Sequence, residues 1–124
     1  PLDHLSGGEL QSAFIAMALA QETEILLLDE PTSNLDLRNQ AVLMSMVHQL
    51  SRENETTVIM AMHDLTLAAQ WCDKLVMLLN GSVFAEGPPD IVLTADNINM
   101  VYDTEVEVEY SRKGNKPIIF SKQN

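Results

Sequence analysis

The feature that most constrains the fold is the segment Ile25-Leu26-Leu27-Leu28-Asp29-Glu30-Pro31. Four consecutive apolar residues are typical of a strand that is covered on both faces in a parallel sheet, and Pro31 ends it. In open α/β sheets, carboxylates at the C-terminal end of such a strand point into the crevice where ligands bind. Burying Asp29 and Glu30 without a metal ion or a partner would cost several kcal/mol. The segment therefore indicates a ligand site more than a purely structural pair of acids.

These two acids would suit the hydrolysis of a phosphate. Asp29 could hold a hydrated Mg²⁺, which prefers oxygen ligands and keeps several waters. Glu30 could accept a proton from a water that attacks a terminal phosphate. His63 follows a second apolar run, Thr57–Met62, and could contact the same phosphate near Glu30. For an isolated histidine, a polar residue beside a helix cap is the simpler explanation.

Ser6-Gly7-Gly8-Glu9 has the form of a capping box at the start of a helix that should run to about Ala20. A helix N-terminus carries unsatisfied N–H groups and attracts anions, and the two glycines let a phosphate approach the backbone. The alternative is an ordinary well-capped helix. The sequence has no glycine-rich loop that ends in Gly-Lys-Ser or Gly-Lys-Thr.

The rest of the chain predicts an α/β fold with a strand-helix-strand unit, whose crossover should be right-handed. Asp36 and Asp64 are the expected N-caps of two helices, although Ser33-Asn34-Leu35-Asp36 could equally be an ordinary loop. Asn80-Gly81 predicts a tight hairpin. The expected elements are helices at Leu37–Arg52, Leu65–Cys72, Pro89–Leu93 and Asp96–Val101, and strands at Ile25–Leu28, Thr57–Met62, Leu75–Leu79, Val83–Glu86, Val106–Tyr110 and Ile118–Phe120.

Composition excludes several classes of protein. The formal net charge of −11 argues against nucleic-acid binding, which needs clustered Lys and Arg. The single cysteine, Cys72, excludes an internal disulfide and fits a reducing compartment. No apolar run approaches the ~20 residues that cross a bilayer, so any link to a membrane should go through a partner. Because the sequence begins at Pro1, we expect it to be the C-terminal part of a longer protein.

These elements together resemble the ATP-binding cassette (ABC) family. Leu5–Glu9 resembles its signature motif, Ile25–Glu30 its Walker B strand with the catalytic glutamate, Ser33–Asp36 its D-loop, and His63 its switch histidine. The resemblance implies a P-loop NTPase-like fold. It would have a partial parallel sheet with flanking helices, a C-terminal hairpin and a small α+β tail. Residues 1–87 would form the C-terminal half of the ATPase core, and residues 88–124 an appendage.

Within the family, the chain is most similar to the ATPase subunits of importers for iron-siderophore, haem or cobalamin, through residues 62–69, 71–73 and 81–87. The resemblance implies a homodimer of ATPase subunits that binds transmembrane permease subunits at the cytoplasmic face of the membrane. A periplasmic or extracellular binding protein would take part indirectly. It implies ATP and Mg²⁺ as cofactors, with Asp29 at the metal and Glu30 and His63 in catalysis. The nucleotide-binding residues would be Ser6, Gly7, Gly8, Glu9, Ser33 and Asp36, of which Ser6, Gly7 and Gly8 would touch ATP held by the partner.

The sequence departs from the family pattern in three respects. The Walker A loop, the Q-loop and the adenine-stacking aromatic residue are absent, and Leu10-Gln11-Ser12-Ala13 lacks the usual positive charge. The tail from Thr104 onwards matches the family only loosely. In the family the Walker A strand lies between the strands at residues 57–62 and 75–79. Without it, the chain should close the gap by rearrangement or pair with a second copy. Two other functions stay open: an ATPase of chromosome maintenance or DNA repair, and a non-catalytic interaction fragment.

Overall fold

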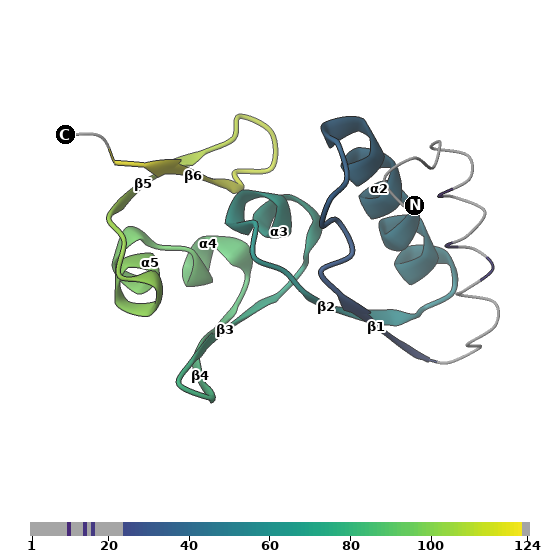
Figure 1. Ribbon diagram of the computed structural model, residues 1–124, viewed down its shortest axis with the longest axis horizontal. Helices are drawn as coiled ribbons and strands as arrows, with labels where there is room; N and C mark the ends of the chain where they lie inside the picture. The colour runs from purple at the N-terminus through teal and green to yellow at the C-terminus, as the bar shows by residue number, and fades with distance from the viewer. Residues whose placement is uncertain (1–9, 11–13, 15, 17–23, 123–124) are drawn as a thin grey trace. The chain divides into compact units, whose positions relative to one another are not determined.

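The computed structural model describes Leu10, Phe14, Ala16 and residues 24–122 (Figure 1). It divides the chain into two compact units, Pro1–Met62 and His63–Asn124. Each unit is described by itself below. Leu10, Phe14 and Ala16 are helical, in the segment where the sequence predicts the first helix.

The first unit contains the predicted strand-helix-strand motif. β1 (Ile25–Asp29) and β2 (Thr57–Ala61) are parallel, in a register that pairs Ile25 with Thr57 and Asp29 with Ala61. The helix α2 (Leu37–Glu53) joins them and lies alongside the two strands (Figure 1). All three elements were predicted to within a residue at either end.

The core of the first unit lies between this sheet and its helices. One buried cluster consists of Phe14, Leu26, Leu43 and Val47. Residues four apart on a helix lie on one face, and alternate residues of a strand lie on one side, so this face of α2 packs against one side of β1. The opposite face of the sheet is uncovered in the part of the chain that the structure describes. Ile25, Leu27 and Ile59 are 53%, 68% and 53% exposed there.

The prediction that both faces of β1 are covered is therefore wrong for the described residues. An unbroken apolar run shows that a strand can be covered on both faces. It does not supply the second layer, which must come from other residues.

The second unit is built from two antiparallel hairpins and three short helices, in the order that the sequence predicts. Asn80 and Gly81, at the tip of the first hairpin, both have positive φ (51° and 79°), as its tight turn requires. The elements are α3 (Leu65–Trp71), β3 (Leu75–Leu79), β4 (Ser82–Gly87), α4 (Pro89–Val92), α5 (Ala95–Tyr102), β5 (Val106–Tyr110) and β6 (Pro117–Ser121).

One buried cluster holds the second unit together. It joins Ala69 of α3 and Met77 of β3 to Val92, Leu93 and Ile98 around α4 and α5. Residues on both sides of position 87 thus share a core. The division into residues 1–87 and 88–124 concerns the family's domain organisation and stays a prediction.

Each sheet of the described chain has only two strands: β1 with β2, β3 with β4, and β5 with β6. None of the helices among the described residues is both long and apolar enough to span a bilayer.

Candidate functional site

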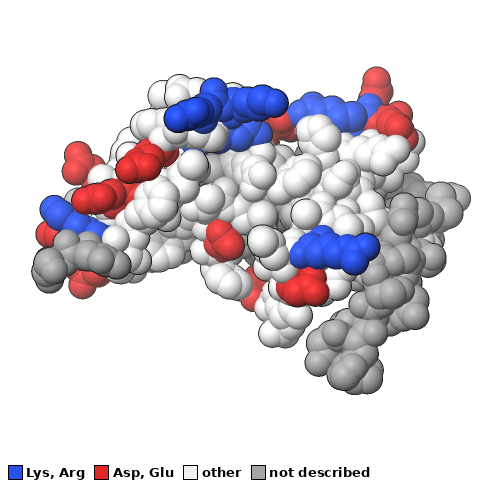
Figure 2. All heavy atoms as spheres, turned by 90° about the horizontal axis from the view of Figure 1, so that it is seen from above, with Lys and Arg blue, Asp and Glu red and all other residues white. Residues whose placement is uncertain are grey.

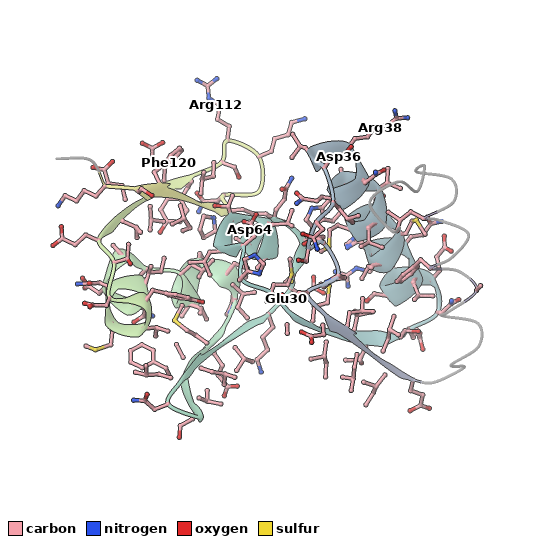
Figure 3. The ribbon with its side chains drawn as sticks, in the orientation of Figure 1. Glu30, Asp36, Arg38, Asp64, Arg112 and Phe120 are labelled. Atoms are coloured by element: carbon pink, nitrogen blue, oxygen red, sulfur yellow. The ribbon has the colours of Figure 1, made fainter. Side chains whose placement is uncertain are left out.

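The two predicted acids lie at the C-terminal end of β1. Asp29 is opposite Ala61 in the sheet register, and the backbone N–H of Glu30 donates to the carbonyl oxygen of Ala61 at 2.8 Å. The parallel ladder therefore continues one residue past the strand and brings the ends of β1 and β2 together. Figure 3 shows Glu30 at this point, where the chain leaves β1.

Both carboxylates are exposed, which corrects the expectation that the pair is buried. Their exposure follows from the uncovered outer face of β1 and from the end of the strand at Asp29. The desolvation argument for a ligand site therefore fails in this structure. What remains is a geometric argument, since two adjacent acids at the carboxyl end of a parallel strand are open to a cation or a phosphate.

Glu30 has a backbone conformation that the sequence did not reveal. Its φ of +46° lies in the left-handed region, which costs a residue with a Cβ roughly 1–2 kcal/mol. The carbonyl oxygen of Glu30 then accepts the N–H of Ser33 at 3.1 Å, so the chain turns at once after the strand. Such strain concentrates at functional sites.

The predicted cap of α2 is confirmed. Oδ1 of Asp36 accepts the backbone N–H of Asn39 at 2.8 Å, and Figure 3 shows Asp36 at the start of the helix. Ser33 and Asp36 are both exposed. The two D-loop residues that the sequence selects are therefore accessible on the same short loop that follows Glu30.

Gln40 is a residue of this loop region that the sequence analysis missed. Its side-chain Nε2 donates to the carbonyl oxygen of Leu35 at 3.3 Å, in a partly buried position. The available signal was its place in the first turn of a helix capped by Asp36, from which a long amide can reach back to the preceding loop.

His63 is exposed and lies between β2 and α3, immediately before the helix cap. That cap is confirmed, because Oδ1 of Asp64 accepts the N–H of Leu67 at 3.0 Å. His63 begins the second unit, and its predicted approach to Glu30 stays a prediction. Ser6, Gly7, Gly8 and Glu9 lie outside the described residues, so their predicted roles also stay predictions.

The described residues contain no group of three or more His, Cys, Asp or Glu side chains that could hold a metal ion. A complete protein cage for a metal is therefore absent from this part of the chain. A single exposed carboxylate at Asp29 still suits Mg²⁺, which is commonly held by one or two carboxylates together with substrate phosphates and waters.

Charge on the face shown in Figure 2 occurs as small groups of both signs, with much uncharged surface between them. The largest blue group lies along the upper edge of the view. The net charge of −11 gives no support to binding of a nucleic-acid backbone, which needs clustered cations.

A family model described as ABC transporter matches residues 1–33. Among curated relatives, the iron(3+)-hydroxamate import ATP-binding protein FhuC of Bacillus subtilis is 41% identical over 118 residues, which are 95% of this chain and 44% of the relative. The cobalamin import ATP-binding protein BtuD of Halobacterium salinarum is 45% identical over 104 residues, 84% of this chain and 26% of the relative. The chain thus spans less than half the length of these relatives.

Two solved structures extend the comparison. An inward-facing transporter of the metal-chelate ABC type superposes with a TM-score of 0.81 at 27% identity, over 96% of this chain and 48% of that one. The ATP-binding cassette MJ0796, a dimer bound to ADP and phosphate, gives a TM-score of 0.56 at 33% identity, over 70% of this chain and 37% of its own.

Proposed function

Because the chain belongs to the ABC transporter family of ATP-binding proteins, we propose that it is part of the ATP-binding and ATP-hydrolysing subunit of an importer. The cargo would be a metal chelate or a cofactor of the iron-siderophore, haem or cobalamin type. The observation that carries the proposal is the accessible pair Asp29 and Glu30 at the end of β1. The import functions of the similar proteins support the choice of cargo class.

In the proposed mechanism, the site residues of this chain act on two different ATP molecules. Glu30 accepts the proton of the attacking water and His63 contacts the terminal phosphate, both on ATP bound by their own subunit. Asp29 would hold Mg²⁺, which when bound neutralises charge on the phosphates. The segment Ser6-Gly7-Gly8-Glu9 would bind the nucleotide of the partner, because the backbone N–H groups of the helix N-terminus that its sequence predicts would suit a phosphate.

Ser33 and Asp36 belong to the loop between these two functions. They are exposed and follow the proposed base along the chain. We propose that they lie at the interface with a second ATPase subunit, in a homodimer. The dimeric state of the similar cassette supports this arrangement.

The remaining partners are also proposed. Permease subunits would hold the protein at the cytoplasmic face of the membrane, and a binding protein outside would deliver the cargo to them. The superposition on a metal-chelate transporter supports this setting.

The substitution Glu30→Gln tests the proposed base. In the complete ATPase subunit, turnover should fall by at least about a hundredfold, because general-base catalysis contributes that much, whereas ATP should still bind. Glu24→Gln is the matched control, since it makes the same charge change at the opposite end of β1. Steady-state hydrolysis that persists in Glu30→Gln would contradict the proposed role.

The two alternatives make different predictions. An ATPase of chromosome maintenance or DNA repair is not favoured, because the similar proteins above are import subunits and the chain is strongly acidic. The second alternative is that the chain is a non-catalytic interaction fragment. The 124-residue chain alone should then bind Mg-ATP weakly or not at all, since its sequence has no glycine-rich phosphate loop. Calorimetric titration with Mg-ATP measures this.

A further inference from the structure

The loop from Thr32 to Asp36 contains both inward-facing and exposed side chains. Thr32 is only 8% exposed, and Leu35 packs against the buried cluster of the first unit. Ser33, Asn34 and Asp36, in contrast, are exposed. Two side chains of the loop, Thr32 and Leu35, are thus turned inward, and the other three, all polar, are exposed.

Backbone hydrogen bonds tie the same loop to the end of β1. Ser33 N–H donates to the carbonyl oxygen of Glu30 at 3.1 Å, and Leu35 N–H donates to that of Thr32 at 3.2 Å. Asn34 has a φ of +65°, a conformation that asparagine tolerates better than most residues. Consecutive turns therefore link Glu30 to the start of α2.

Gln40 links the other end of the loop to the first turn of α2. Its backbone N–H donates to the carbonyl oxygen of Asp36 at 2.9 Å, and its side chain donates to that of Leu35 at 3.3 Å. The second bond matters because the Leu35 carbonyl precedes the helix cap and receives no donor from the helix ladder itself.

We propose that Gln40 is a positioning residue, which holds Ser33 and Asp36 in a set place relative to Glu30 through its bond to the Leu35 carbonyl. The catalytic part of this inference rests on the proposed ATPase function. In that setting, loss of the bond loosens the loop and slows hydrolysis, but leaves binding of ATP to its own subunit unchanged.

Hydrogen exchange in the 124-residue chain tests the positioning itself. Gln40→Glu keeps the side-chain shape and places a carboxylate where the helix dipole favours it, but it removes the donor. The amides of Ser33 and Leu35 should exchange about fivefold faster, as expected for one lost hydrogen bond of about 1 kcal/mol. Unchanged exchange at both amides would overturn the inference.

Gln49→Glu is the matched control on the same helix. The Gln49 side chain bonds Glu53 at 3.1 Å in an exposed position, far along α2 from the loop. This variant makes the same chemical change and should leave the exchange of Ser33 and Leu35 within twofold of the unsubstituted chain. Equal acceleration in both variants would mean that the effect comes from the helix as a whole, and would also overturn the inference.

The catalytic consequence is tested in the complete ATPase subunit. Gln40→Glu should lower kcat severalfold with an unchanged dissociation constant for ATP, while Gln49→Glu changes neither. Faster loop exchange with unchanged kcat would overturn the catalytic part. If the complete subunit shows no ATP hydrolysis while Gln40→Glu still accelerates loop exchange, the proposed function fails and the positioning of the loop stands.

Discussion

The backbone N–H of Glu30 donates to the carbonyl oxygen of Ala61 at 2.8 Å, while Glu30 itself has a left-handed φ of +46°. The last bond of the parallel ladder thus ends at a residue in an unfavourable conformation. The backbone of the residue that follows β1 is therefore hydrogen-bonded to the neighbouring strand at the point where the chain turns away.

Glu30→Gly should stabilise the chain by about 1 kcal/mol, because glycine adopts positive φ without the Cβ penalty. The same substitution should abolish the proposed hydrolysis. Chemical denaturation of the 124-residue chain measures the first effect. A lower free energy of unfolding in Glu30→Gly would show that the conformation is not strained.

Glu55→Gly is the control for this prediction. Glu55 also has positive φ, at 53°, and follows α2 away from the proposed site. Glu55→Gly should raise the free energy of unfolding by a similar amount without loss of turnover. It also removes one negative charge and one left-handed non-glycine residue, but at a position away from the proposed site.

Asp36→Ala should lower the free energy of unfolding by about 1 kcal/mol, because it removes the side-chain acceptor that caps α2. Asp36→Ser keeps an acceptor and should lose much less. Circular dichroism at the helix band during denaturation reports the difference. Equal losses in the two variants would mean that the carboxylate acts by some other contact.

Leu27→Lys should reduce self-association of the isolated chain. Leu27 is 68% exposed on the apolar outer face of the β1–β2 sheet, and uncovered apolar faces and strand edges promote pairing with another copy. Sedimentation velocity compares the chain with this variant and with Leu37→Lys, whose leucine is 82% exposed at the start of α2. A stable monomer before any substitution would contradict the prediction.

Stability should fall at alkaline pH through Cys72. Burial raises the pKa of this thiol above its ordinary value of 9.0, Asp73 raises it further, and Lys116 acts in the opposite direction. Between the ordinary and the raised pKa, the unfolded thiol loses its proton while the folded one keeps it. The folded state therefore binds more protons, and stability is full below pH 9.0 and falls above it.

Cys72→Ala should remove that part of the pH dependence. When denaturation midpoints are measured between neutral and alkaline pH, the midpoint of Cys72→Ala should fall less steeply with pH than that of the unsubstituted chain. Identical profiles for the two proteins would assign the alkaline loss to other groups.

Local signals explain which parts of this structure could be predicted. The caps at Asp36 and Asp64 and the Asn80-Gly81 turn are each decided by neighbouring residues along the chain, and each was predicted correctly. The lengths of β1 and α2 follow from apolar periodicity and from Pro31 in the same way.

The residues alone predict the order of the elements, their caps and the two acids at the carboxyl end of β1. The exposure of Asp29 and Glu30 and the left-handed φ of Glu30 appear only in the folded chain. Burial depends on whether other segments supply a second layer, and the unfavourable backbone conformation of Glu30 is accompanied by its hydrogen bond to Ala61 of β2. Neither property can be found in the residues themselves, because both belong to contacts between segments distant along the chain.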